Sequence, residues 1–213
     1  MLSEEKIDKK DFLLDIAEGL FAQLGYEGSS TRHIAADAGM NISMLNYYFG
    51  SKEGLYKAVV ERRLSTFRQT LINLNEENIS SWDKLFRCMD LYVERMMSNS
   101  NFHRLIHREL SVGQRSEMNE FITDSLLKNI EEVKRIIEEG IANKTFRNVD
   151  VEMTVASIFG TQGYILNATH IASKVLKEDL HNPQVREENI KPRLKRFLHD
   201  YLQAHLTPNE SKK

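Results

Sequence analysis

The sequence predicts an all-α protein of about nine helices, and two observations carry that prediction. Apolar residues recur at intervals of three and four along almost the whole chain, the spacing that places them on one side of a helix. Only 3 prolines and 10 glycines interrupt the 213 residues, and no alternating strand pattern or internal repeat is visible. We expect a small N-terminal domain of three helices over residues 1–55 and a larger helical domain over residues 56–213.

Local start and stop signals mark the N-terminal helices. A first helix is expected over residues 9–24, and Gly25 supplies its stop. Two short helices follow over residues 31–38 and 42–48. Ser51 is a natural N-cap, so a long fourth helix is expected from there to residue 74.

The rest of the chain contains further amphipathic helices separated by polar joints. Asp150 is a natural N-cap for a helix that is apolar on most of its faces. Pro192 is tolerable because it falls in the first turn of the last helix, which follows a polar connection over residues 174–188. The helices expected here cover residues 82–97, 102–110, 118–142, 151–170 and 190–206.

Residues 29–55 have the spacing of a helix-turn-helix. Ala35 lets two helices approach closely, and four residues later Gly39 stands where a tight turn requires positive φ. The residues expected to face inward are Ile34, Ala38, Met40, Leu45 and Tyr48, and those expected to face outward are Ile42, Ser43, Met44, Asn46 and Tyr47. The outward set could enter a DNA major groove. The alternative is an ordinary corner between two helices, which small helical proteins often contain.

A specific order of residues runs through this region: Ala17, Phe21, Gly25 to Thr31, Ile34-Ala35, Ala38 to Met40, Leu45 to Phe49 and Ser51 to Tyr56. In this order the chain resembles the N-terminal domain of the tetracycline-repressor (TetR) family of transcription regulators. The resemblance implies that Thr31, Tyr48 and Lys52 grip DNA phosphates, which suits a helix N-terminus, a phenol and an ammonium group. It also implies that Arg32 contacts a base edge or the backbone.

Two positions depart from the family pattern. Asn46 stands where the family usually has an aromatic residue, and Ser43-Met44 replaces a small or polar pair. An asparagine can pair with adenine through two hydrogen bonds, while Ile42 and Met44 can pack on thymine methyl groups. We therefore expect an A·T-containing half-site.

The resemblance further implies that residues 151–170 and 190–206 pair with their copies in a homodimer. Small residues permit close helix packing, and an apolar stripe on the last helix would be partly exposed in a monomer. The residues expected at this interface are Ala156, Gly160, Gly163, Leu194, Phe197, Leu198 and Tyr201. Periodicity leaves open an intramolecular core instead.

Methionines, aromatic residues and a few polar groups in the larger domain could line an effector cavity. The candidates are Met89, Tyr92, Met96, Phe102, Ile106, Phe121, Phe159, Gln162 and Tyr164. The alternative for each is a plain core position, the usual place of apolar residues at helical spacing.

Other chemistry has weaker support. His103 and His107 are four residues apart and close to Glu109, but no third metal ligand is identifiable by spacing, so we expect no metal, no cofactor and no catalytic residues. A helical metal-dependent enzyme, or a protein-interaction module without operator binding, is the alternative. Cys88 is the single cysteine, and it forms no internal disulfide.

Composition narrows the function further. A net charge of -2 argues against a protein that binds nucleic acid regardless of sequence. No apolar run is long enough to span a membrane, and the N-terminus lacks a secretory signal, so a cytoplasmic location is expected. We expect a ligand-responsive repressor that binds a palindromic DNA operator as a homodimer and is released by an unknown small-molecule effector.

Overall fold

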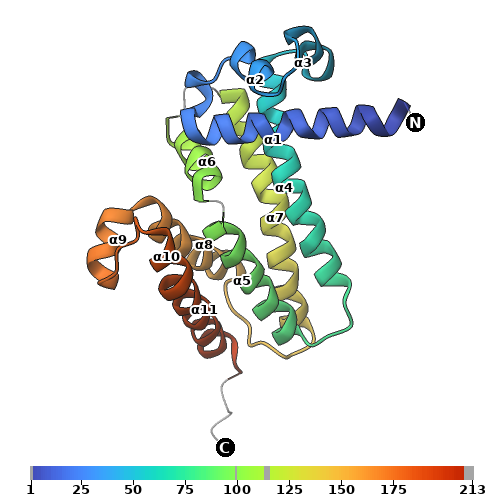
Figure 1. Ribbon diagram of the computed structural model, residues 1–213. Helices are drawn as coiled ribbons and strands as arrows, with labels where there is room; N and C mark the ends of the chain where they lie inside the picture. Colours follow the sequence, from blue (N-terminus) through green and yellow to red (C-terminus); the bar gives the residue numbers. More distant parts are fainter. Residues whose placement is uncertain (1, 99, 113–115, 209–213) are drawn as a thin grey trace, which may run out of the picture. The chain divides into compact units, whose positions relative to one another are not determined.

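The computed structural model describes residues 2–98, 100–112 and 116–208, and these are almost entirely helical, with no strand among them. Packing divides the chain into two compact units (Figure 1). Unit 1 runs to Thr66 and includes Asn101–Leu126, whereas unit 2 comprises Phe67–Ser100 and the chain from Leu127 onward. The all-α prediction is confirmed. The expected DNA-binding and effector domains, residues 1–55 and 56–213, stay a prediction about function.

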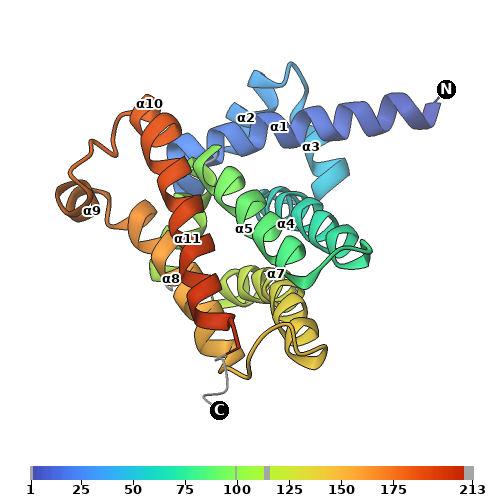
Figure 2. The ribbon, with the colours of Figure 1, turned by 90° about the horizontal axis from the view of Figure 1, so that it is seen from below.

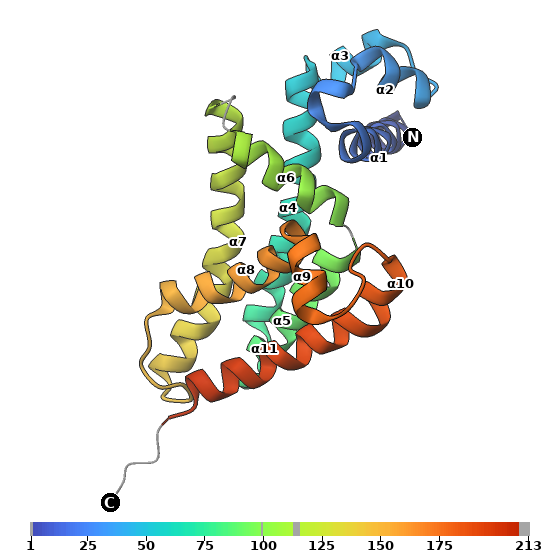
Figure 3. The ribbon, with the colours of Figure 1, turned by 90° about the vertical axis from the view of Figure 1, so that its left-hand side faces the viewer.

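Unit 1 is built on one apolar core that includes Leu13, Ile34, Leu45 and Val59, none of which is exposed. Its helices are α1 (Leu2–Gly28), α2 (Thr31–Asp37), α3 (Ile42–Phe49), the first part of α4 (Lys52–Glu76), α6 (Ser100–Val112) and the first part of α7 (Ser116–Ala142). Figure 3 shows α2 and α3 as a short pair beside α1. Helix α1 begins seven residues earlier than expected, since no proline or glycine precedes residue 9 to stop it.

A glycine and two serine caps mark helix boundaries in this unit, although α1 runs to Gly28, past the end expected at residue 24. Gly25 has φ 75° and ψ 175°, a non-helical conformation with positive φ that interrupts α1. Ser30 caps α2 by accepting the His33 N–H at 3.1 Å. Ser51 caps α4 by accepting the Gly54 N–H at 3.0 Å.

Unit 2 contains α5 (Ser81–Ser98), the later parts of α4 and α7, α8 (Val151–Asn167), α9 (Thr169–Leu176), α10 (Pro183–Val185), a π-helical turn (Arg186–Ile190) and α11 (Lys191–Leu206). Helices α5 and α11 are in contact, and Figure 2 shows α11 running along this unit. Glu94 on α5 accepts from Lys191 at 2.7 Å and from Lys195 at 2.6 Å. These two ammonium groups lower the pKa of the Glu94 carboxyl.

One predicted helix was wrong at its end. Residues 151–170 do not form a single helix, because α8 ends at Asn167 and Ala168 adopts φ -99° and ψ 39°. The Thr169 hydroxyl then donates to the Leu166 carbonyl at 2.9 Å, and α9 starts in a new direction that buries Ala172. The connection over residues 174–188 is also more helical than expected, since Asn182 caps a short turn at Pro183.

Gly140 provides a test of the packing in unit 2. A Cβ at this position would overlap the ring of Phe146, which is buried and meets Trp82 at a centroid distance of 4.6 Å. We expect Gly140→Ala to lower the free energy of unfolding by about 1–3 kcal/mol, measured by urea denaturation. Gly19→Ala is the control, because its Cβ meets open space and should leave stability unchanged or slightly raised. Equal effects would refute this account.

Candidate functional site

Helix α3 presents an outer face of polar and apolar side chains. Ile42 is 39% exposed and Tyr47 is 70% exposed, and Ser43 and Asn46 are also exposed. Met44 is half-buried, so it is less available than expected. Leu45 is fully buried and joins the core of unit 1. The inward and outward faces predicted from the sequence are therefore found, with Met44 between them.

The turn between α2 and α3 has the geometry that its glycine predicted. Gly39 has φ 63°, and its N–H donates to the Ala36 carbonyl at 3.0 Å. The next N–H, of Met40, donates to Ala35 at 2.8 Å. Asn41 then caps α3 by accepting the Met44 N–H at 2.9 Å. These bonds position the first turn of α3 before any ligand is present.

The residues expected to hold phosphates lie at or beside helix ends. Thr31 is the first residue of α2, and Arg32 after it is exposed. Lys52 begins α4, and its ammonium nitrogen lies 4.2 Å from the centroid of the Tyr26 ring. Tyr48 is half-buried and packs against the core of unit 1. A cation held on an aromatic ring loses less freedom when it pairs with a phosphate.

Two further charged or titratable side chains, which the sequence did not indicate, lie on α1 and α2. Lys10 places its ammonium nitrogen 5.8 Å from the Phe49 ring, at the end of α3. His33 is exposed on α2, and its Nε2 lies 3.5 Å from Oδ2 of Asp37. Both residues are off the apolar pattern, so periodicity offers no signal for them, and only the packing of α1 and α2 shows where they lie.

The predicted effector residues divide between the two units. Phe102, Ile106 and Phe121 belong to the core of unit 1. Met89, Tyr92 and Phe159 lie together in a core cluster of unit 2, and Met96 lies in an adjacent cluster of that unit. The rings of Tyr92 and Phe159 meet at a centroid distance of 4.7 Å. Gln162 is buried, whereas Tyr164 is 41% exposed.

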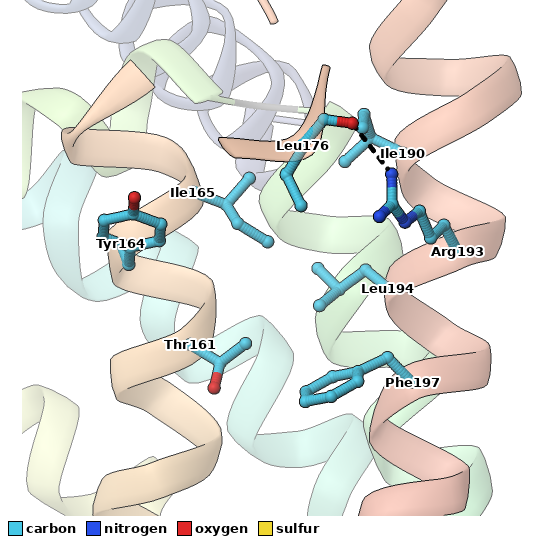
Figure 4. A pocket seen from close by; sticks show the side chains of 8 residues that line it. All are labelled: Thr161, Tyr164, Ile165, Leu176, Ile190, Arg193, Leu194 and Phe197. Atoms are coloured by element: carbon cyan, nitrogen blue, oxygen red, sulfur yellow. Dashed lines mark hydrogen bonds between the residues drawn. The ribbon is translucent and has the colours of Figure 1, made fainter. Parts of the chain in front are cut away.

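A pocket of about 290 Å³ opens in unit 2 between α8, α9 and α11 (Figure 4). Arg193 stands at its edge and donates to the Leu176 carbonyl at 3.1 Å. Of the residues predicted for an effector cavity, only Tyr164 lines it. The sequence could not indicate this pocket, since Leu176, which α9 contributes to it, falls within residues 174–188, which were expected to be a polar connection. Its lining residues are Thr161, Tyr164, Ile165, Leu176, Ile190, Arg193, Leu194 and Phe197.

The residues expected at a dimer interface fall into two groups. Ala156, Gly160 and Phe197 are exposed on α8 and α11, and Phe197 is 51% exposed. Gly163 and Tyr201 are half-buried. Leu194 and Leu198 are buried in a core cluster of the protomer itself, which is the alternative that periodicity left open for them.

Other reactive groups give little sign of a second chemistry. Cys88 is fully buried, and burial raises the pKa of its thiol to about 12, so the reactive thiolate form is suppressed. No group of three or more possible metal ligands occurs within residues 2–98, 100–112 and 116–208. Within the same ranges, every helix is too short or too polar to cross a membrane.

Comparisons with known proteins agree with this geometry. The HTH-type transcriptional regulator YttP of Bacillus subtilis is 29% identical over 138 residues, which are 63% of this chain and 66% of that protein. The HTH-type transcriptional repressor NicS of Pseudomonas putida is 27% identical over 190 residues, which are 84% of this chain and 85% of that protein.

A solved structure shares the fold. The transcriptional regulator FadR from Bacillus subtilis, in complex with stearoyl-CoA, superposes with a TM-score of 0.68 at 20% identity and covers 88% of this chain and 96% of its own. The family model for bacterial regulatory proteins of the tetR family matches residues 13–59, and that for the tetracyclin repressor-like C-terminal domain matches residues 82–191. This chain belongs to the TetR family of DNA-binding transcription regulators.

Proposed function

We propose that this chain is a cytoplasmic repressor that binds a palindromic operator as a homodimer and leaves it when a small molecule binds the helical body. The exposed face of α3 is the observation that carries the proposal. An eight-residue helix that exposes Asn46 and Tyr47 while Leu45 anchors it is suited to enter a major groove.

The DNA contacts divide by chemistry. Asn46 reads an adenine edge, and Ile42 and Met44 approach thymine methyl groups. Ser43 and Tyr47 complete the surface of α3 that faces the groove. Thr31, Tyr48 and Lys52 hold the backbone, and Arg32 contacts a base edge or the backbone. Since the net charge is -2, the attraction comes from where these cations stand.

Release from the operator depends on the spacing between the two recognition helices, one α3 from each protomer. Two recognition helices on one face of DNA must be about 34 Å apart, or a multiple of it. A ligand that binds more tightly to a dimer with another spacing shifts the population away from DNA. That the similar FadR holds stearoyl-CoA supports an effector with a substantial apolar part.

Selection of random duplex DNA by the purified protein, at about 0.15 M salt, tests the proposal. Sequencing of the bound fraction should show an inverted repeat with A·T pairs in each half-site. Failure to enrich any sequence, with folding and dimerisation verified, would reject the operator-binding function. Enrichment of only G·C-rich half-sites would reject the role given to Asn46 alone.

Two substitutions separate base reading from phosphate binding. Asn46→Ala should reduce discrimination at one base pair by about 1–3 kcal/mol, because it removes the paired hydrogen bonds to one base. Lys52→Ala should weaken binding to all sequences and reduce the salt slope by about 1. Binding isotherms at several salt concentrations measure both, with the exposed Lys174→Ala as the control that changes neither. The assignments fail if the two variants behave alike.

The dimer interface has a test of its own. Phe197 is 51% exposed on α11, so Phe197→Asp would bury a charge in the proposed interface, and we expect at least a tenfold weaker dimer. Leu127→Asp is the matched control, since Leu127 is 47% exposed on α7, outside the proposed interface. Sedimentation equilibrium measures the dimer dissociation constant of both variants. A dimer that tolerates Phe197→Asp as well as Leu127→Asp would place the interface elsewhere.

A further inference from the structure

Gln162 is a buried amide that the protein does not satisfy. Only 2% of the residue is exposed, and it lies on the inner stripe of α8 between Ile158 and Leu166. Neither its amide nitrogen nor its amide oxygen has a hydrogen-bond partner among the described residues. Helical spacing would suit an apolar residue at this position equally well, so a glutamine here calls for a reason.

Three other buried polar side chains of unit 2 have hydrogen-bond partners. The Lys84 ammonium group donates to Glu139 at 3.0 Å and to the Asn75 carbonyl at 2.8 Å. Glu132 accepts from the Asn75 amide at 2.7 Å. The Thr154 hydroxyl donates to the Asp150 carbonyl at 2.7 Å. Gln162 differs from these residues in that both its amide nitrogen and its amide oxygen lack a partner, whereas Asn75 lacks one only at its oxygen.

The residues three and four positions from Gln162 along α8 are aromatic or aliphatic. Phe159 lies three residues earlier on α8, a spacing that makes the two side chains neighbours on the helix surface. Its ring meets Tyr92 of α5 at a centroid distance of 4.7 Å, and Tyr92 in turn meets Phe67 at 5.4 Å. Met96 lies one turn after Tyr92, and its flexible side chain can change rotamer to make room for a ligand.

We infer that Gln162 is the polar anchor of the effector site, and that the effector is a neutral, largely apolar molecule whose head carries an acceptor and a donor on neighbouring atoms. This inference rests on the proposed function. An amide has a donor nitrogen and an acceptor oxygen, so a primary carboxamide or an un-ionised carboxylic acid satisfies both ends together. A ligand with an acceptor alone leaves the Gln162 oxygen without a partner. The buried members of this stripe, Thr154, Val155, Ile158 and Leu166, carry no charge that would balance an anion. On α5, the Arg95 guanidinium is held over the Phe67 ring, with its central carbon 4.9 Å from the ring centroid.

The first test needs no ligand. Gln162→Leu and Gln162→Met replace an unsatisfied amide by an apolar group of similar size, so either should raise the Tm of the free protein by about 2–4 °C. Gln203→Leu on α11 makes the same chemical change at an exposed position and should leave the Tm unchanged. A fall in Tm for both Gln162 variants would show that the fold itself uses the amide and would overturn the inference.

The second test uses hexanamide and 2-heptanone as probes, which differ by an amino group in place of a methyl group. Calorimetric titration of the free wild-type dimer should show hexanamide binding at least tenfold more tightly than 2-heptanone. In Gln162→Leu that preference should fall to about onefold, while Gln203→Leu keeps it. Hexanamide at tenfold above its Kd should raise the wild-type Tm by about 3–6 °C.

Two results would overturn the inference: a hexanamide preference that survives in Gln162→Leu, or a wild-type protein that binds neither probe. Because these measurements use free protein, they do not depend on finding an operator. Loss of the proposed function would instead appear as absence of sequence-specific DNA binding, with the probe titrations unaffected.

Discussion

The burial of Leu45 is the constraint on which the proposed DNA-reading surface depends. Helix α3 has eight residues, and a helix of that length is not stable alone in water. Leu45 is its one fully buried residue, so the position of the helix is set by that side chain in the core of unit 1, by the Asn41 cap and by the turn at Gly39. The exposed residues of α3 lie on the side of the helix that faces away from the core of unit 1.

Local signals in the sequence predicted where several helices begin. Ser51 and Asp150 are caps that the structure bears out, since the hydrogen bonds of a cap involve only residues within one turn. The inward and outward faces of α3 also followed from spacing. The roles of the outward residues in DNA binding remain predictions, because reading a base depends on a partner that is not part of the fold.

The fold of unit 2 includes features that the sequence could not predict. The break at Ala168 has no glycine or proline to announce it, and it arises because α9 turns to bury Ala172. Without that break α9 could not be foreseen, nor could the pocket that its Leu176 helps to line. Leu194 and Phe197 belong to one apolar stripe, yet one is buried in the protomer and the other is half exposed. Spacing alone cannot separate these cases, because it does not say which neighbour covers a face.

The interleaving of the two units limits how this protein can be taken apart. Unit 1 draws Phe102, Leu105, Ile106, Met118 and Ile122 into its core from the middle of the chain, so the first 66 residues alone lack part of their own interior. Fusing that segment to a foreign sensor would expose the apolar surface which these side chains cover, and an exposed surface of this kind favours aggregation. A chimera that joins the first 66 residues to another sensor domain would also have to include Asn101–Leu126. The same requirement would restrict recombination between relatives, because a single crossover after residue 66 separates residues that must match.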